Sequence, residues 1–107
     1  MNIQEDYVSF ETAKLLKEKG FNEKVISFYP SGDIQRPTLQ MAMKWLRKVH
    51  KLYINIWADP KDVESNDFDI IFRAQVYNGT SNYGTYEFST YEEACESAIL
   101  YCLENLV

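Results

Sequence analysis

The chain has 107 residues, of which 46% are hydrophobic and 25% charged, the usage of an ordinary folded domain. This length predicts a single domain over residues 1–107. The net charge of −5 argues against nonspecific nucleic-acid binding, which depends on an excess of Lys and Arg. The chain has no long apolar run, and Met1–Asp6 lacks the basic start of a signal peptide. We therefore expect a soluble, cytoplasmic protein.

The first predicted element is a helix over residues 9–19. Ser9 is a good N-cap, Gly20 suits a left-handed helix end, and Phe21 can make the apolar contact that accompanies such an end. Residues 24–29 and 34–36 then predict a short hairpin around a turn at 30–33.

A second helix is predicted from the cap Thr38 to His50. One side carries an apolar stripe at helical spacing: Leu39, Ala42, Met43, Leu46 and Val49. The opposite side carries four cations, which we call the basic ridge: Lys44, Arg47, Lys48 and Lys51. The ridge has a charge of +4, so the rest of the chain has −9. It is a basic patch on an acidic body.

Three strands follow, at residues 52–57, 68–77 and 83–88, with a polar connection at 58–67 and a turn at Asn78-Gly79. Alternation places one apolar set inward: Leu52, Ile54, Ile56, Phe68, Ile70, Phe72, Ala74, Val76, Tyr86 and Phe88. A last helix begins after Ser89 or Thr90 and runs to the C-terminus, with Glu92, Glu93, Glu96 and Glu104 toward solvent.

The order α-β-β-α-β-β-β-α predicts an α+β fold with a mainly antiparallel sheet of four to five strands. The second and third helices should lie together on one face of the sheet. The pattern leaves open whether the first helix joins them or covers the other face.

The sequence contains none of the common motifs that indicate nucleotide binding, zinc binding or catalysis. Four glycines, at 20, 32, 79 and 84, cannot make a dinucleotide-binding or Walker loop. With His50 as the single histidine and no C-x-x-C pair, the common zinc spacings fail, and a place at a helix end explains His50 without catalysis. We predict no catalytic residue, no cofactor and no metal site.

Two further groups of residues have ordinary structural explanations. Cys95 and Cys102 lie on the apolar side of one predicted helix, about 10 Å apart, which predicts reduced, packed thiols. Five acids lie close together in the chain and could attract a hard cation: Asp59, Asp62, Glu64, Asp67 and Asp69. They lack the ligand pattern and central glycine of an EF-hand, so we expect a solvated acidic loop.

Aromatic residues are the strongest signal, because 15% of the chain is Phe, Trp or Tyr. Alternation places a mixed set on the second sheet face: Tyr53, Trp57, Ile71, Arg73, Tyr77 and Tyr83. Protein interfaces are enriched in aromatics and Arg. The sequence thus predicts a non-enzymatic accessory protein that binds a protein partner or itself, unless a helix covers this face. The alternative is a nucleic-acid-binding protein that uses the basic ridge, which the acidic body opposes.

Three segments carry a resemblance: Ser9–Phe21, Pro37-Thr38 with Lys44–His50, and Tyr91–Ala94. Together they resemble a family of small uncharacterised proteins common in phage and prophage regions of gut bacteria. The resemblance covers the three helices and implies a mobile-element origin and a shared fold. The family has no established activity, so no catalytic residue is carried over.

Overall fold

A computed structural model describes residues 4–30, 32–61, 69–84 and 86–107. Its elements, in chain order, are α1 (Phe10–Glu18), α2 (Leu39–His50), β1 (Tyr53–Pro60), β2 (Ile70–Tyr77), β3 (Asn82–Tyr83), β4 (Glu87–Phe88) and α3 (Tyr91–Asn105). The predicted α+β fold is confirmed. None of the helices in these ranges is long and apolar enough to cross a membrane.

The helix ends follow the predicted caps. The Ser9 hydroxyl accepts a hydrogen bond from the Thr12 N–H at the start of α1, and Thr38 and Thr90 cap α2 and α3 in the same way. At the end of α1, the Phe21 N–H donates to the Leu16 carbonyl over 2.9 Å. Gly20 has φ +97°, so α1 ends in the left-handed turn that its sequence predicts.

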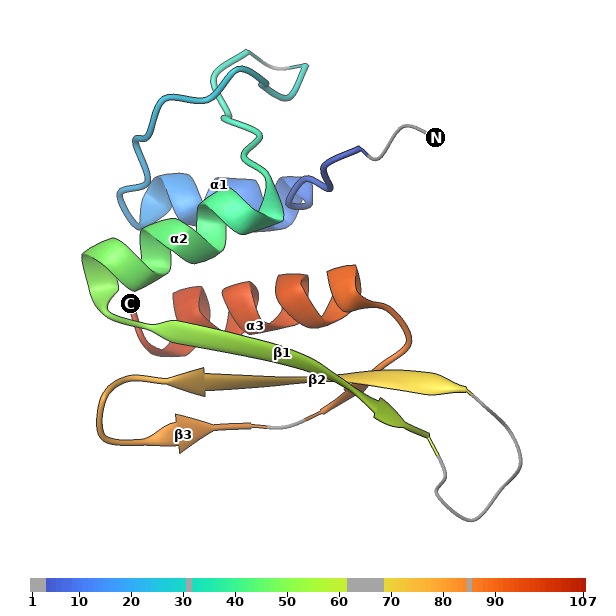
Figure 1. The fold of residues 1–107 in the computed structure, drawn as a ribbon. Helices are drawn as coiled ribbons and strands as arrows, with labels where there is room; N and C mark the ends of the chain where they lie inside the picture. The colour runs from blue at the N-terminus through green and yellow to red at the C-terminus, as the bar shows by residue number, and fades with distance from the viewer. Residues whose placement is uncertain (1–3, 31, 62–68, 85) are drawn as a thin grey trace.

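The predicted hairpin at 24–36 is wrong as a pair of strands. In the described part of this segment a single isolated bridge joins Phe28 and Gln35, separate from the sheet. Figure 1 shows the segment extending beyond the helices, on the side away from the sheet. Val25, Tyr29 and Ile34 pack against the apolar core, but no third strand joins the pair among the described residues, and a two-stranded hairpin by itself is marginal.

The sheet has β2 at its centre and is antiparallel throughout the described pairs. β1 pairs along its whole length with one side of β2, from Tyr53 opposite Tyr77 to Pro60 opposite Ile70. β3 and β4 share the other side of β2. β1 therefore extends beyond the predicted range of 52–57. Because β3 and β4 share one side of β2, the sheet is three strands wide.

All three helices lie on one side of the sheet, and α3 is the middle layer (Figure 1). α3 contacts β1, β2 and β4 below it and both α1 and α2 above it. Its buried residues therefore surround the helix: Ala94, Cys95, Ala98, Ile99, Cys102 and Leu103. The position of α1, which the sequence left open, is settled: α1 packs on α3 and away from the sheet.

Burial of α3 explains why the expectation for Glu96 fails. Predicted to face solvent, this carboxylate instead accepts hydrogen bonds from the Ser9 N–H over 2.9 Å and from the Thr12 hydroxyl over 2.6 Å. The Glu96 carboxylate thus provides a hydrogen-bond acceptor at the N-terminus of α1, where the free N–H groups of a helix favour a negative charge.

The apolar stripe of α2 also differs from the prediction at one position. Val49 is 54% exposed, whereas Trp45 is buried. The Trp45 indole packs edge-on against Phe21, with ring centroids 5.4 Å apart. The residue after the glycine end of α1 therefore fixes which side of α2 is buried.

Candidate functional site: the outer face of the sheet

The β1–β2 register defines a second face, opposite the helices, which we call the outer face. Residues directly opposite each other in an antiparallel pair point to the same side. Tyr53 lies opposite Tyr77, and Trp57 opposite Arg73. The outer face of the two long strands therefore consists of Tyr53, Asn55, Trp57 and Asp59 of β1 with Ile71, Arg73, Gln75 and Tyr77 of β2.

No helix covers the outer face within the described ranges, since α1, α2 and α3 all lie on the opposite side (Figure 1). Tyr53 is 41% exposed and Tyr77 is 43% exposed, and Trp57 and Arg73 are half-buried. Ile71 differs from the prediction, because it is 6% exposed in the central strand and presents little surface to a partner. The accessible part of the face is thus aromatic and polar.

A charged network holds the middle of the outer face. Asp59 Oδ2 accepts a hydrogen bond from Trp57 Nε1 and another from Arg73 Nε, each over 3.0 Å. Arg73 also pairs with Glu87 of β4, with 3.3 Å between Nη2 and Oε1. The network links β1, β2 and β4 and orients the indole before any partner arrives. Because the aromatic side chain is already held in place, it loses less conformational entropy when a partner binds.

Sequence reasoning named Trp57 and Arg73 but missed the acids that hold them. Asp59 was assigned to the acidic loop, and Glu87 was given no role. Asp59 lies in β1 opposite Ile71, two residues along from the Trp57–Arg73 pair. Only the β1–β2 register brings Asp59 close to Trp57 and Arg73. The sequence signal that could have found this contact is charge complementarity between paired strands.

Tyr83 lies on the helix side of the sheet, contrary to the prediction. It is paired with Val76, and its ring packs against Tyr101 of α3, with centroids 5.9 Å apart. The registers of β3 and β4 with β2 differ by one residue, since Val76 lies opposite Tyr83 whereas Phe72 lies opposite Phe88. Because Val76 and Phe72 both face the helices, their partners Tyr83 and Phe88 both point inward despite their odd spacing.

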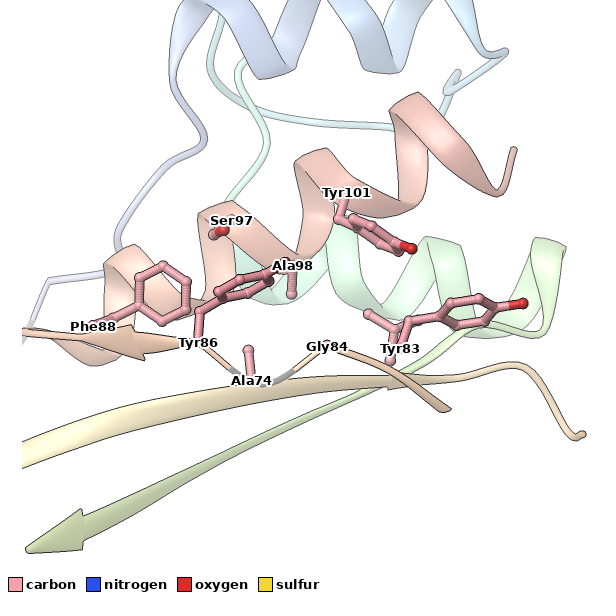
Figure 2. Close-up of a pocket in the computed structure, with 9 residues that line it drawn as sticks. Ala74, Tyr83, Gly84, Tyr86, Phe88, Ser97, Ala98 and Tyr101 are labelled. Atoms are coloured by element: carbon pink, nitrogen blue, oxygen red, sulfur yellow. The ribbon is translucent and has the colours of Figure 1, made fainter. Parts of the chain in front are cut away.

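Gly84 has φ +64° and borders a small cavity beneath α3 (Figure 2). The cavity is about 60 Å³ and is mostly apolar. Small-molecule pockets have volumes of about 300 to 1,000 Å³, so we assign this space no ligand. It is lined by Ala74, Val76, Tyr83, Gly84, Tyr86, Phe88, Ser97, Ala98 and Tyr101.

The basic ridge is exposed on α2, as its four positions are all open to solvent. It lies on the helix side of the sheet, whereas Tyr53, Trp57 and Tyr77 lie on the outer face. The predicted alternative would use the ridge for phosphates and these aromatics for stacking on bases. The structure places the two groups on opposite sides of the sheet.

The residue types best suited to catalysis, His50, Cys95 and Cys102, pack against other side chains or are buried. The His50 ring contacts Trp45 edge-on, with centroids 4.8 Å apart. Its Nε2 atom is buried without a hydrogen-bond partner among the described residues. Burial raises the pKa of Cys95 to about 11 and that of Cys102 to about 12, so both thiols stay protonated at neutral pH.

The acidic loop is described only at its two ends. Asp59 belongs to the network with Arg73, and Asp69 accepts a backbone hydrogen bond from Lys61. Asp62, Glu64 and Asp67 lie outside the described residues. The described part of the chain contains no group of three His, Cys, Asp or Glu side chains placed to hold a metal ion.

Comparisons of the chain with protein-family models, curated proteins and solved structures find no match. The mobile-element origin therefore stays a prediction.

Proposed function

We propose that this protein is a non-enzymatic binding protein whose outer sheet face contacts another protein. The observation that carries the proposal is a sheet face that no helix of the described residues covers, with two exposed tyrosines around an indole held by a charged network. A half-exposed Tyr combines a large apolar surface with a polar tip, and Trp, Tyr and Arg dominate the binding energy of protein interfaces.

Charge favours a different protein over a second copy. Each copy carries a net charge of −5, so two copies that meet through this face repel each other.

The test uses a displayed library of random peptides selected for binding to the full-length protein. Peptides selected on the wild type should lose about tenfold or more in affinity for the double variant Trp57→Ser/Tyr77→Ser. The matched control is Ile26→Ser/Tyr86→Ser, which removes two apolar side chains that are 97% and 66% exposed and lie outside the outer face. Equal binding to both double variants would contradict the proposal.

The mass of the purified protein in solution is a second check. We expect a single chain, because the net charge of −5 makes the copies repel each other. A stable dimer that dissociates in the Trp57→Ser/Tyr77→Ser variant would show that a second copy is the partner.

The nucleic-acid alternative stays a prediction with its own measurement. Four phosphate contacts by the basic ridge would give a log–log slope of binding against salt of roughly −3 to −4. A gel-shift titration over a salt series measures this slope.

A further inference from the structure

β1 is an edge strand of the sheet. β2 pairs with one side of it, and among the described residues nothing pairs with the other side, which we call the open edge. An open edge presents a row of free N–H and C=O groups to which another extended chain can bind.

The hydrogen bonds show which residues face the open edge. Lys61 N–H donates to the Asp69 carbonyl over 2.9 Å, in line with the β1–β2 register. In an antiparallel pair the residues alternate between bonding the partner strand and pointing away from it. Odd-numbered residues of β1 therefore bond β2, and Ile54, Ile56 and Ala58 direct their N–H groups outward. Pro60, which has no N–H, occupies an outward position, where no sheet bond is lost.

Over residues 53–58 the open edge lacks the usual protection against added strands. These residues contain no charged side chain and no proline, and the register with β2 runs without a bulge. Natural edge strands are normally blocked by Lys, proline, bulges or short length. Asp59 and Pro60 stand at the end of β1, so the six residues before them are the site for strand addition.

The basic ridge lies on the same flank of the molecule as the open edge. α2 contacts β1 but, in the described part of the chain, not β2, β3 or β4. Figure 1 shows α2 leading directly into β1 on the edge side of the helical layer. Lys51, the last ridge residue, stands two positions before Tyr53, where β1 begins. A strand added at the open edge would thus lie beside the strand that α2, the helix carrying the basic ridge, contacts.

We propose that an extended acidic segment of the protein partner adds to the open edge as a further strand. Every second side chain of the added segment points to the helix side, where its acidic groups meet the basic ridge. The remaining side chains of the segment point to the outer face beside Tyr53 and Trp57. The inference rests on the proposed function, because the added strand widens the outer face that the partner contacts. Charge complementarity selects an acidic segment over a second copy, since two copies paired at this edge would bring two basic ridges together.

The probe is a synthetic peptide that alternates glutamate with threonine and valine, titrated against the full-length protein. We expect binding that weakens with added salt, about tenfold weaker binding of a peptide with lysine in place of glutamate, and weaker binding of a scrambled peptide of the same composition. Methylation of every peptide nitrogen, which blocks both edges of the peptide, should abolish binding without any change to the protein. Equal binding of the glutamate and lysine peptides, or unchanged binding after methylation, would overturn the proposal.

Two pairs of protein variants locate the peptide. Ala58→Pro removes an outward N–H from an exposed residue without removing a bond to β2 and should abolish binding, whereas Ala58→Val keeps the N–H and should bind normally. Arg47→Glu/Lys48→Glu should weaken binding about tenfold, whereas Lys14→Glu/Lys24→Glu, with the same change of net charge, should leave it within about twofold.

The outcomes separate this inference from the proposed function. If library-selected peptides depend on Trp57 and Tyr77 but bind Ala58→Pro and Ala58→Val equally, the strand-addition proposal fails and the outer face remains the binding site. If the protein self-associates and Ala58→Pro makes it monomeric, a second copy is the occupant and the acidic segment is rejected.

Discussion

The two faces of the sheet use the same strands and the same alternation, yet they are stabilised differently. On the helix side, Ala74 and Val76 are buried beneath α3 and belong to the apolar core. On the outer face, aromatic side chains stay partly exposed, and ion pairs link the strands. The difference teaches that alternation divides residues between two faces but does not decide which face is covered. The packing of all three helices on one side decides that.

The largest expected effect is the difference in stability between a substitution in the core and one on the outer face. Leu103 of α3 is fully buried. Leu103→Ala should lower the free energy of unfolding by about 2 to 5 kcal/mol, because it removes buried methyl groups and leaves a cavity. Tyr77→Ser, on the outer face, should change it by about 1 kcal/mol or less. Urea unfolding of both variants measures the difference, and equal losses would mean that the outer face is part of the core.

A pH titration of stability tests the burial of α3. Burial raises the pKa of Cys102 to about 12 from an ordinary value of 9.0, so the folded protein holds a proton that the unfolded chain releases. The stabilisation is complete below about pH 9 and is lost as the pH rises toward the folded value. The free energy of unfolding should fall by up to about 1.4 kcal/mol per pH unit for this thiol.

The control for that titration is Cys102→Ala. Urea unfolding between about pH 8.5 and 10.5 should show a shallower pH dependence in the variant, since its other titrating groups are those of the wild type. Identical slopes would mean that Cys102 is not shielded from water in the middle layer.

The smallest expected effect concerns the network on the outer face. Asp59→Asn removes the charge that pairs with Arg73, and both side chains are partly exposed, so stability should fall by about 1 kcal/mol or less. The indole of Trp57 should lose its fixed orientation, which fluorescence anisotropy of that residue can follow in a Trp45→Phe background. Unchanged mobility of the indole would show that Asp59 does not position it.

Much of the fold follows from short stretches of sequence. Ser9 and Thr38 are predictable as helix caps, and Gly20 with Phe21 as a helix end, because these signals act within a few residues. For the last helix the sequence leaves Ser89 and Thr90 open, and the structure selects Thr90. The outward positions of Tyr53, Trp57 and Tyr77 were equally predictable, since β1 and β2 alternate without interruption.

Errors arose where distant segments meet. The predicted hairpin at 24–36 had strand-like residues but no sheet to join. Alternation predicts the wrong face for Tyr83 because β3 and β4 pair with β2 in registers that differ by one residue. Glu96 was expected in solvent because its contacts with Ser9 and Thr12 span more than 80 residues of sequence.

The sequence by itself determined the helices, their caps, the α+β class and the division of β1 into two faces, because these depend on local hydrogen bonding and on the period of the side chains. Only the tertiary structure decided that α3 is enclosed, that α1, α2 and α3 all lie opposite the outer face and that Asp59 holds Trp57 and Arg73 in place. Layer order and strand register depend on which distant surfaces bury apolar area together, and no local pattern records that choice.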